Sequence, residues 1–342
     1  MLKFIKCNKK MNNLYPLKFK PIIKDKIWGG DTLSKFYNKR QNNLPNIGES
    51  WEISGVHGDL SVVANGFLAE NNIEELIEVY MGDITGDAIY EKFGNEFPLL
   101  IKFIEAKEDL SIQVHPGDDM AKKRHNAYGK TEMWYILESA SDAKIYTGFK
   151  DGVTREDYRN AVENGTVQNL LNIEKAEKGD VFFTPAGRVH AIGAGTTLIE
   201  IQQTSDITYR ISDWNRQTSG SEKRELHTDL ALDALDFTET STRKKINVKP
   251  ELNIFGNIVD CNFFTVNTLK FNKKINKNYY FTDSFIIYIC LDGELTVSCN
   301  DSSEKITKGE TILLPAMIKE VTLEPVGESQ ILEVYINSES SI

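Results

Sequence analysis

An internal echo is the feature that most constrains how this chain can fold. Residues 178–190 read KGDVFFTPAGRVH, and residues 308–320 read KGETILLPAMIKE. Each stretch opens with Lys-Gly and an acidic residue, continues as a short apolar run and reaches Pro-Ala at the same offset. A second echo lies upstream, because WYILE at 134–138 resembles YICLDGELTV at 288–297. Two echoes in the same order predict that one β unit occurs twice in the chain.

Most of the remaining sequence reads as short strands separated by turn residues. Two segments, at about 71–93 and about 154–172, instead have helical character, and Thr154 with Asp157 forms a capping-box pattern at the start of the second. Many strands with few helices favour a double-sheet β-roll over a parallel α/β sheet. The Lys-Gly-Asp turn before a strand resembles that of cupins. We therefore expect a mainly β fold of two cupin-type jelly-roll β-barrels, with the helices inserted in the N-terminal part.

A polar, charged stretch ending in proline, TETSTRKKINVKP, is typical of a linker and places a boundary near 240–250. We expect a catalytic cupin domain over 1–245, which contains both helical insertions. A degenerate cupin-like β domain without metal would follow over 246–342.

Composition excludes several classes of partner. The net charge is −10 and no basic patch dominates, which argues against nucleic acid. No apolar span reaches 18 residues, and lysines at positions 3, 6, 9 and 10 interrupt the apolar N-terminus, so neither a membrane helix nor a secretory signal is expected. The four cysteines form no CxxC pair, which indicates reduced thiols in a cytoplasmic protein. Met11 is an alternative start.

Four side chains suggest a metal site. Gln113 and His115 are two residues apart before a Pro-Gly turn, so in a strand they face the same way. Glu132 opens an apolar strand, where a carboxylate is costly to bury unless it is paired or bound to metal. With His190 they would give two nitrogen and two oxygen ligands, which suits Zn²⁺ and also Mn²⁺, Co²⁺ or Fe²⁺. The alternatives are a surface histidine at each strand end and a Glu132–Lys130 ion pair.

The register of the echo limits this site to one half of the chain. Glu320 stands in the place of His190, and Ile286 stands in the place of Glu132. If the chain contains two rolls, only the first keeps a metal-binding set.

Several motifs, in order, resemble those of the type I mannose-6-phosphate isomerase family in its short bacterial form, within the cupin superfamily. The resemblance covers about residues 17–235 and extends more weakly to the C-terminus. Where long-form members carry an RGGLTPK-type segment, this chain has YRISDWNR, which leaves the phosphate contacts open. The motifs are PIIKDKIWGG, GESWEISGVHG, SIQVHPGDD, GKTEMWYIL, FFTPAGRVHAIGAG and LIEIQQTSDITYRISDW.

The resemblance implies a zinc-dependent aldose–ketose isomerase with one Zn²⁺ per chain. It would interconvert mannose 6-phosphate and fructose 6-phosphate through an enediol. The implied metal ligands are Gln113, His115, Glu132 and His190, and the implied essential arginine is Arg210. Further implied pocket residues are Ser111, Lys130, Glu200, Glu49 and His57.

Roles for these residues follow from the chemistry. Glu200 is the candidate for proton transfer, although a salt bridge to Arg210 is an equal alternative. Arg210 could hold the phosphate or steady the enediolate, and we favour the second. Lys130 lies two residues before Glu132 and should share its face. Arg188 and Arg216 are expected to be solvated turn residues, and His125 and His227 to be structural.

Two other functions remain as alternatives. Two histidines and a glutamate also match the facial triad of cupin Fe(II) dioxygenases, although those usually present HxH and not QxH. A non-enzymatic sugar-binding cupin is the other alternative. For the isomerase we expect a sugar-phosphate substrate, no nucleic-acid or membrane partner, and a monomer or weak homodimer.

Overall fold

The computed structural model describes residues 14–40, 44, 46–214, 216, 224–238 and 245–337. The alternative start at Met11 and the middle of the expected linker lie outside these residues.

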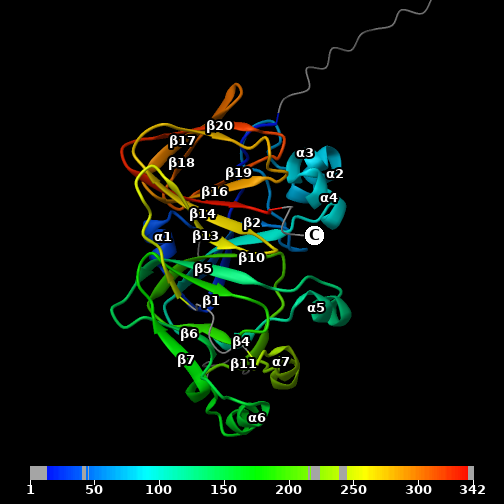
Figure 1. The fold of residues 1–342 in the computed structure, drawn as a ribbon, viewed down its shortest axis with the longest axis vertical. Helices are drawn as coiled ribbons and strands as arrows, with labels where there is room; N and C mark the ends of the chain where they lie inside the picture. Colours follow the sequence, from blue (N-terminus) through cyan, green and yellow to red (C-terminus); the bar gives the residue numbers. More distant parts are fainter. Residues whose placement is uncertain are drawn as a thin grey trace, which may run out of the picture.

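Four antiparallel sheets stack as layers, and two of them are built from the first 247 residues (Figure 1). The expectation of a mainly β fold is confirmed. The larger sheet, in spatial order, contains β1 (Ile22–Gly30), β2 (Ile47–Ser54), β3 (Leu99–Ala106), β10 (Thr196–Gln203), β5 (Glu132–Ser139), β8 (Asp180–Thr184) and β12 (Lys245–Asn247). The outer sheet contains β11 (Tyr209–Ser212), β4 (Ile112–Val114), β9 (His190–Ile192), β6 (Lys144–Phe149) and β7 (Leu171–Lys175).

The remaining two sheets come from the C-terminal third of the chain, coloured yellow to red in Figure 1. The inner one contains β13 (Phe255–Asp260), β14 (Thr265–Phe271), β21 (Ser329–Tyr335), β16 (Ile286–Asp292) and β19 (Thr311–Leu314). The outer one contains β15 (Ile275–Asn278), β20 (Glu320–Pro325), β17 (Glu294–Cys299) and β18 (Ser302–Thr307).

Short helices lie at the periphery of the sheets. The capping box predicted at Thr154 is present, because its side chain accepts from the Asp157 amide and the Asp157 side chain accepts from the Thr154 amide. Among the described residues, no helix is long and apolar enough to cross a membrane. The helices are α1 (Thr32–Phe36), α2 (Ile73–Tyr80), α3 (Gly82–Thr85), α4 (Asp87–Phe93), α5 (Asp118–His125), α6 (Arg155–Glu163), the 3₁₀ helix η1 (Val167–Leu170) and α7 (Thr228–Ala234).

The two pairs of similar sequence segments also form strands that pair in the same register. In the first half Glu132 pairs with Thr184, and in the second half Ile286 pairs with Leu314. These two pairs correspond, because Ile286 aligns with Glu132 and Leu314 aligns with Thr184 when the similar segments are superimposed. The duplicated unit is therefore real at the level of strand pairing, and the loss of the Glu132 carboxylate in the second half is a true substitution.

One carboxylate position persists in both halves. Glu200 on β10 lies opposite Trp134, and Glu333 on β21 lies opposite Tyr288 in the equivalent strand pair. The Glu333 carboxylate is buried and accepts hydrogen bonds from the Tyr279 hydroxyl and from Asn267 Nδ2, the latter at 2.8 Å. Its Oε1 also lies 3.1 Å from Lys277 Nζ.

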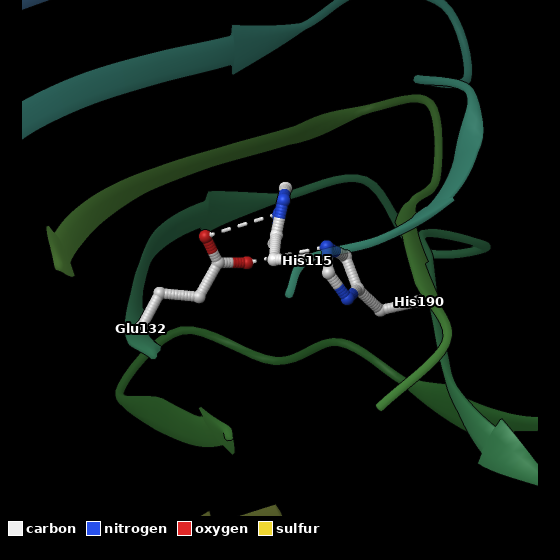
Figure 2. A group of neighbouring side chains, drawn as sticks. All are labelled: His115, Glu132 and His190. Carbon is white, nitrogen blue, oxygen red and sulfur yellow. Dashed lines mark ion pairs between the residues drawn. The ribbon is translucent and has the colours of Figure 1, made fainter. Parts of the chain in front are cut away.

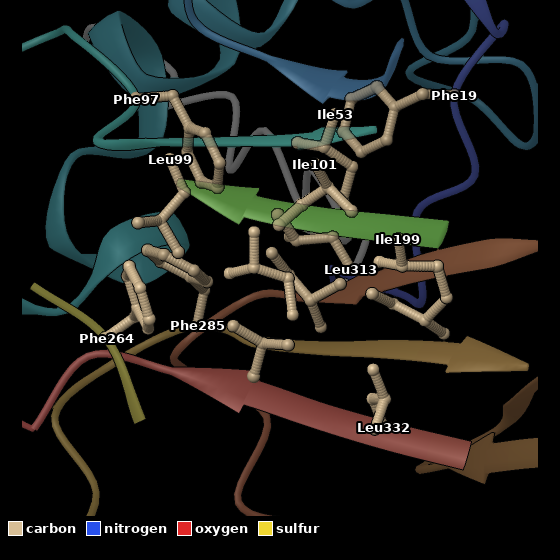
Figure 3. Packing of buried hydrophobic residues seen from close by; sticks show 14 of the residues in the cluster. Phe19, Ile53, Phe97, Leu99, Ile101, Ile199, Phe264, Phe285, Leu313 and Leu332 are labelled. Carbon is tan, nitrogen blue, oxygen red and sulfur yellow. The ribbon is translucent and has the colours of Figure 1, made fainter. Parts of the chain in front are cut away.

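The two inner sheets share one apolar core. Alternation along β10 turns Ile199 and Ile201 toward the inner C-terminal sheet, while Glu200 faces the opposite way. From the other side Leu332 and Phe285 pack into the same cluster (Figure 3). The N-terminal segment adds a further link, because Leu17 forms an antiparallel bridge with Leu313.

This shared core predicts that the halves unfold together. Leu332→Ala should lower the free energy of unfolding by about 2–5 kcal/mol, because it opens a cavity between the two sheets. All four tryptophans lie before the expected boundary at 245, at Trp28, Trp51, Trp134 and Trp214. Their fluorescence during urea unfolding should therefore report a lower midpoint, although the substitution lies in the second half.

Val326→Ala, at a position 64% exposed, is the control and should change the stability by less than about 0.5 kcal/mol. A tryptophan transition that stays at the wild-type midpoint in Leu332→Ala would show that the halves are independent.

Candidate functional site

Three strands bring one carboxylate and two imidazoles together between the two N-terminal sheets. Glu132 begins β5, His190 begins β9 and His115 follows the end of β4. All three side chains are buried (Figure 2). Their potential ligand atoms lie within 4.8 Å of one another.

Backbone carbonyls orient both imidazoles. His115 Nδ1 lies 2.8 Å from the Ile207 carbonyl, and His190 Nδ1 lies 2.9 Å from the Arg188 carbonyl. Each Nδ1–H therefore donates, which leaves an unprotonated Nε2 facing Glu132 as the ligand atom. Lys130 Nζ lies 3.2 Å from the His115 Nε2, so a bound metal would displace this contact. The Nε2-to-carboxylate distances are 3.6 Å for His115 and 3.3 Å for His190 (Figure 2). Burial, followed by the charge of Lys130, lowers the pKa of His115, and burial lowers the pKa of His190 to about 3. Both rings are neutral at neutral pH, as metal ligands must be.

The Glu132 carboxylate lacks the donors that a buried carboxylate needs. Neither of its oxygens accepts a hydrogen bond from a residue within the described ranges. The ion pair with Lys130 does form, with Nζ 2.8 Å from Oε2, but its geometry is not that of a hydrogen bond. Burial, followed by the charge of Glu200, raises the pKa of Glu132 to about 8. An unsatisfied carboxylate between two neutral imidazoles fits a divalent cation.

Gln113 lies beside this group. It is paired in register with His190, and its Nε2 is 3.2 Å from His190 Nε2. Its Oε1 is 3.5 Å from the Ser111 hydroxyl. A half-turn of the amide would present the oxygen to the same space, as a fourth ligand requires.

The Glu200 carboxylate contacts two lysines and a tryptophan, and not the predicted partner Arg210. Lys102 Nζ donates to Oε1 at 3.0 Å, Trp134 Nε1 donates to Oε2 at 2.9 Å, and Lys130 Nζ lies 3.8 Å from Oε1. The proposed alternative of a salt bridge to Arg210 is therefore wrong, and Lys102 takes that place. Burial alone would raise the pKa of Glu200, but the charges of Lys102 and Lys130 outweigh it and lower the pKa to about 2.

Arg210 lies on β11, directly across from Gln113. Its Nη1 donates to the Glu225 carbonyl at 2.9 Å, and its backbone amide donates to His227 Nδ1 at 3.1 Å. His227 thus has the structural role expected of it. The Arg210 Nε is buried and has no hydrogen-bond partner among the described residues.

A cavity of about 450 Å³ opens beside these groups. His57 does not line it: its side chain is 74% exposed, lies 3.4 Å from Glu74 and 3.7 Å from Glu96, and borders a separate depression. A substrate contact for His57 stays a prediction. The predicted residues that line the cavity are Glu49, Ser111, Gln113, Lys130, Glu200 and Arg210.

The cavity also contains residues that the sequence analysis missed. Lys102, Trp51, Lys26 and Arg224 line it. Lys102 had a readable signal, because a lysine in the apolar run FPLLIKFIEA must find a partner if the strand is buried. Trp51 carried no such signal. It donates from Nε1 to Glu49 Oε2 at 2.6 Å.

Two predicted surface arginines are not solvated. Arg188 is buried, and its Nη1 donates to the Phe183 carbonyl. Arg216 pairs with Asp213, with Nη2 3.0 Å from Oδ1. The expectation was wrong because turn position says nothing about which carbonyls or carboxylates the fold brings close.

Comparisons with known proteins agree on one family. The model for the catalytic domain of type I phosphomannose isomerase matches residues 16–151, and the model for the mannose-6-phosphate isomerase cupin domain matches residues 255–336. Mannose-6-phosphate isomerase ManA of Bacillus subtilis is 33% identical over 320 residues, covering 92% of this chain and 97% of its own. Mannose-6-phosphate isomerase of Streptococcus mutans is 30% identical, covering 94% and 98%. The crystal structure of the Bacillus subtilis mannose 6-phosphate isomerase superposes with a TM-score of 0.81 at 28% identity, covering 94% of this chain and all of that one.

The site geometry predicts which histidine substitution removes a bound metal. His190→Ala should reduce the metal content from about one divalent ion per chain to near zero, because no neighbouring group can replace its Nε2. His125→Ala is the control, since His125 bonds to the Tyr209 hydroxyl at 2.7 Å and is not one of the three clustered groups. Metal analysis of dialysed protein measures both, and full retention in His190→Ala would contradict the assignment.

Proposed function

The chain belongs to the type I phosphomannose isomerase family, and on that premise we propose that it interconverts mannose 6-phosphate and fructose 6-phosphate through an enediol. The single observation that carries the proposal is the unsatisfied Glu132 carboxylate between two neutral imidazoles. It lies next to a cavity lined with cationic groups, of a size for a sugar phosphate.

We propose zinc as the metal, held by Gln113, His115, Glu132 and His190. The set of two imidazole nitrogens and two oxygens is one that Zn²⁺ accepts in catalytic sites. When bound, the ion supplies Lewis-acid stabilisation of negative charge on the sugar oxygens.

Different residues of the protein then transfer the proton and stabilise the charge. Glu200 takes the proton from C2 of the aldose while the C1 oxygen gains a proton, which gives the enediol. Return of a proton to C1, with loss of one from the C2 oxygen, gives the ketose. Arg210 and Lys130 stabilise the charge that develops on the oxygens, and Ser111 and Glu49 contact the substrate from the cavity walls.

The contacts of Glu200 set a condition on its role. A carboxylate whose pKa is about 2 is ionised, as a base must be, but it binds a proton weakly. Donation from Lys102 and Trp134 lowers its affinity for the C2 proton, but each oxygen keeps a second lone pair that can accept that proton.

We further propose that the four sheets form two double-sheet jelly rolls of the cupin type. The pair that includes β5 and β9 would be the catalytic roll, which through β12 extends two residues beyond the expected boundary at 245. The pair that includes β16 and β20 would be the metal-free roll, within residues 246–342, because Ile286 and Glu320 replace Glu132 and His190.

The first test is an isomerase assay on metal-depleted protein. Purified protein should convert mannose 6-phosphate to fructose 6-phosphate, lose the activity on chelation and regain it with added zinc. Oxygen uptake in the presence of Fe(II) would instead support a dioxygenase. Binding of the sugar phosphate without turnover, in zinc-loaded protein, would support a binding module.

The second test concerns Glu200. Glu200→Gln should lower kcat by about 10²–10⁴-fold with unchanged zinc content, because it keeps the shape and removes the base. Exchange of the C2 proton with solvent should slow in parallel. Glu333→Gln is the control at the equivalent position of the second half and should leave kcat per folded molecule unchanged. More than about a tenth of normal kcat in Glu200→Gln would make Glu200 a counter-ion of Lys102 and not a base.

A further inference from the structure

The arginines at one end of the cavity share a single carboxylate. Arg224 donates to Asp213 through Nε, at 2.9 Å, and through Nη2. Arg216 donates to the same carboxylate through Nη2 at 3.0 Å. Asp213 is mostly buried, so this contact holds Arg224 in a fixed orientation at the cavity wall. With Arg210, three guanidinium groups gather around one carboxylate.

The positive charge of the cavity is concentrated at this end. Glu108 and Glu225 lie near the arginines, but they are 59% and 84% exposed. Asp206, which lines the cavity, is also exposed, so water screens all three carboxylates. Elsewhere in the cavity the lysines have a carboxylate partner each: Lys24 with Asp59, Lys26 with Glu49, Lys102 with Glu200 and Lys130 with Glu132. An anion that enters this otherwise acidic protein therefore finds its uncompensated positive charge beside Arg210 and Arg224.

The sheet also places this end away from the metal group. His190, Gln113 and Arg210 lie side by side on β9, β4 and β11, so Arg210 is two strand spacings, about 10 Å, from His190. The segment that starts at Arg224 bonds to the far edge of β11, since the His227 amide donates to the Arg210 carbonyl at 2.7 Å. Burial, followed by the charge of Arg224, lowers the pKa of Arg210, which shows that the two cations interact.

We propose that Arg224, oriented by Asp213, binds the phosphate of the substrate, and that Arg210 between it and the metal group serves the reacting end. Asp213 occupies Nε and one N–H of Nη2, which leaves Nη1 and the other N–H of Nη2 as a planar fork for two phosphate oxygens. A lysine at the same place could not offer such a fork. An extended sugar phosphate with C1 and C2 at the metal group reaches toward this end with its phosphate. This assignment rests on the proposed function only in taking the substrate to be a sugar phosphate.

The test separates phosphate binding from turnover on the zinc-loaded protein. Arg224→Gln should raise KM for mannose 6-phosphate by about tenfold or more and change kcat by less than about threefold, because the phosphate is held equally in the ground and transition states. Arg210→Lys should instead lower kcat. Inorganic phosphate, titrated calorimetrically without substrate, should bind Arg224→Gln about tenfold or more weakly than the wild type.

Arg159→Gln, at an exposed position on α6, is the control and should bind phosphate like the wild type. If Arg224→Gln loses zinc or melts early because Asp213 keeps only Arg216 as a partner, the double variant Arg224→Gln/Asp213→Asn replaces it, with the same expected loss. Wild-type phosphate affinity in the folded variant would overturn the assignment. Loss of phosphate affinity in a protein without isomerase activity would leave the anion site standing and reject the proposed function.

Discussion

The site is organised around a carboxylate that is buried and accepts no hydrogen bond from the part of the chain that the structure describes. Burying an ionised group costs far more than burying an apolar one unless a partner compensates the charge. At Glu132 the imidazoles cannot compensate, because both direct an unprotonated Nε2 at the carboxylate. A divalent cation in the space between them would satisfy all three groups, whereas without one burial raises the pKa of Glu132 to about 8. The two backbone carbonyls that fix the rings, at Ile207 and Arg188, are therefore as important to the site as the ligands.

A second charge system lies directly against the first. Lys130 touches Glu132 and approaches Glu200, while Lys102 pairs with Glu200 from the neighbouring strand β3. Period-two alternation on β10 turns Glu200 into this system and turns Ile199 and Ile201 into the shared apolar core. A one-residue slip in the pairing of β10 would exchange these faces, so the core packing of the inner sheets also fixes the register of Glu200.

A feature could be predicted from the sequence where it is a local pattern, and could not where it depends on which strands become neighbours. The duplicated unit could be predicted, because strand alternation and equivalent turns are local patterns. The grouping of His115, Glu132 and His190 was expected from their ligand chemistry and from the family resemblance. Lys102 and Trp51 could not be placed in the cavity, because their position depends on which strands become neighbours. Arg216 was misread for the same reason, since its partner Asp213 is close in sequence but its burial is set by the fold. His57 belongs to a motif of the family, yet the structure puts it outside the cavity.

The C-terminal part of the chain shows how a buried carboxylate can be held by a different set of partners. Glu333 occupies the place of Glu200, but its partners are Tyr279, Asn267 and Lys277. Replacing Glu333 alone would remove the acceptor that the three donors share. Replacing one donor alone would remove one of the contacts that stabilise the buried carboxylate. Each residue of this cluster therefore depends on the others for its polar contacts, so the cluster can change only through several substitutions at once. Hydrogen-bond partners alone can therefore fix an acid inside a β fold, and a buried acid is by itself no sign of catalysis.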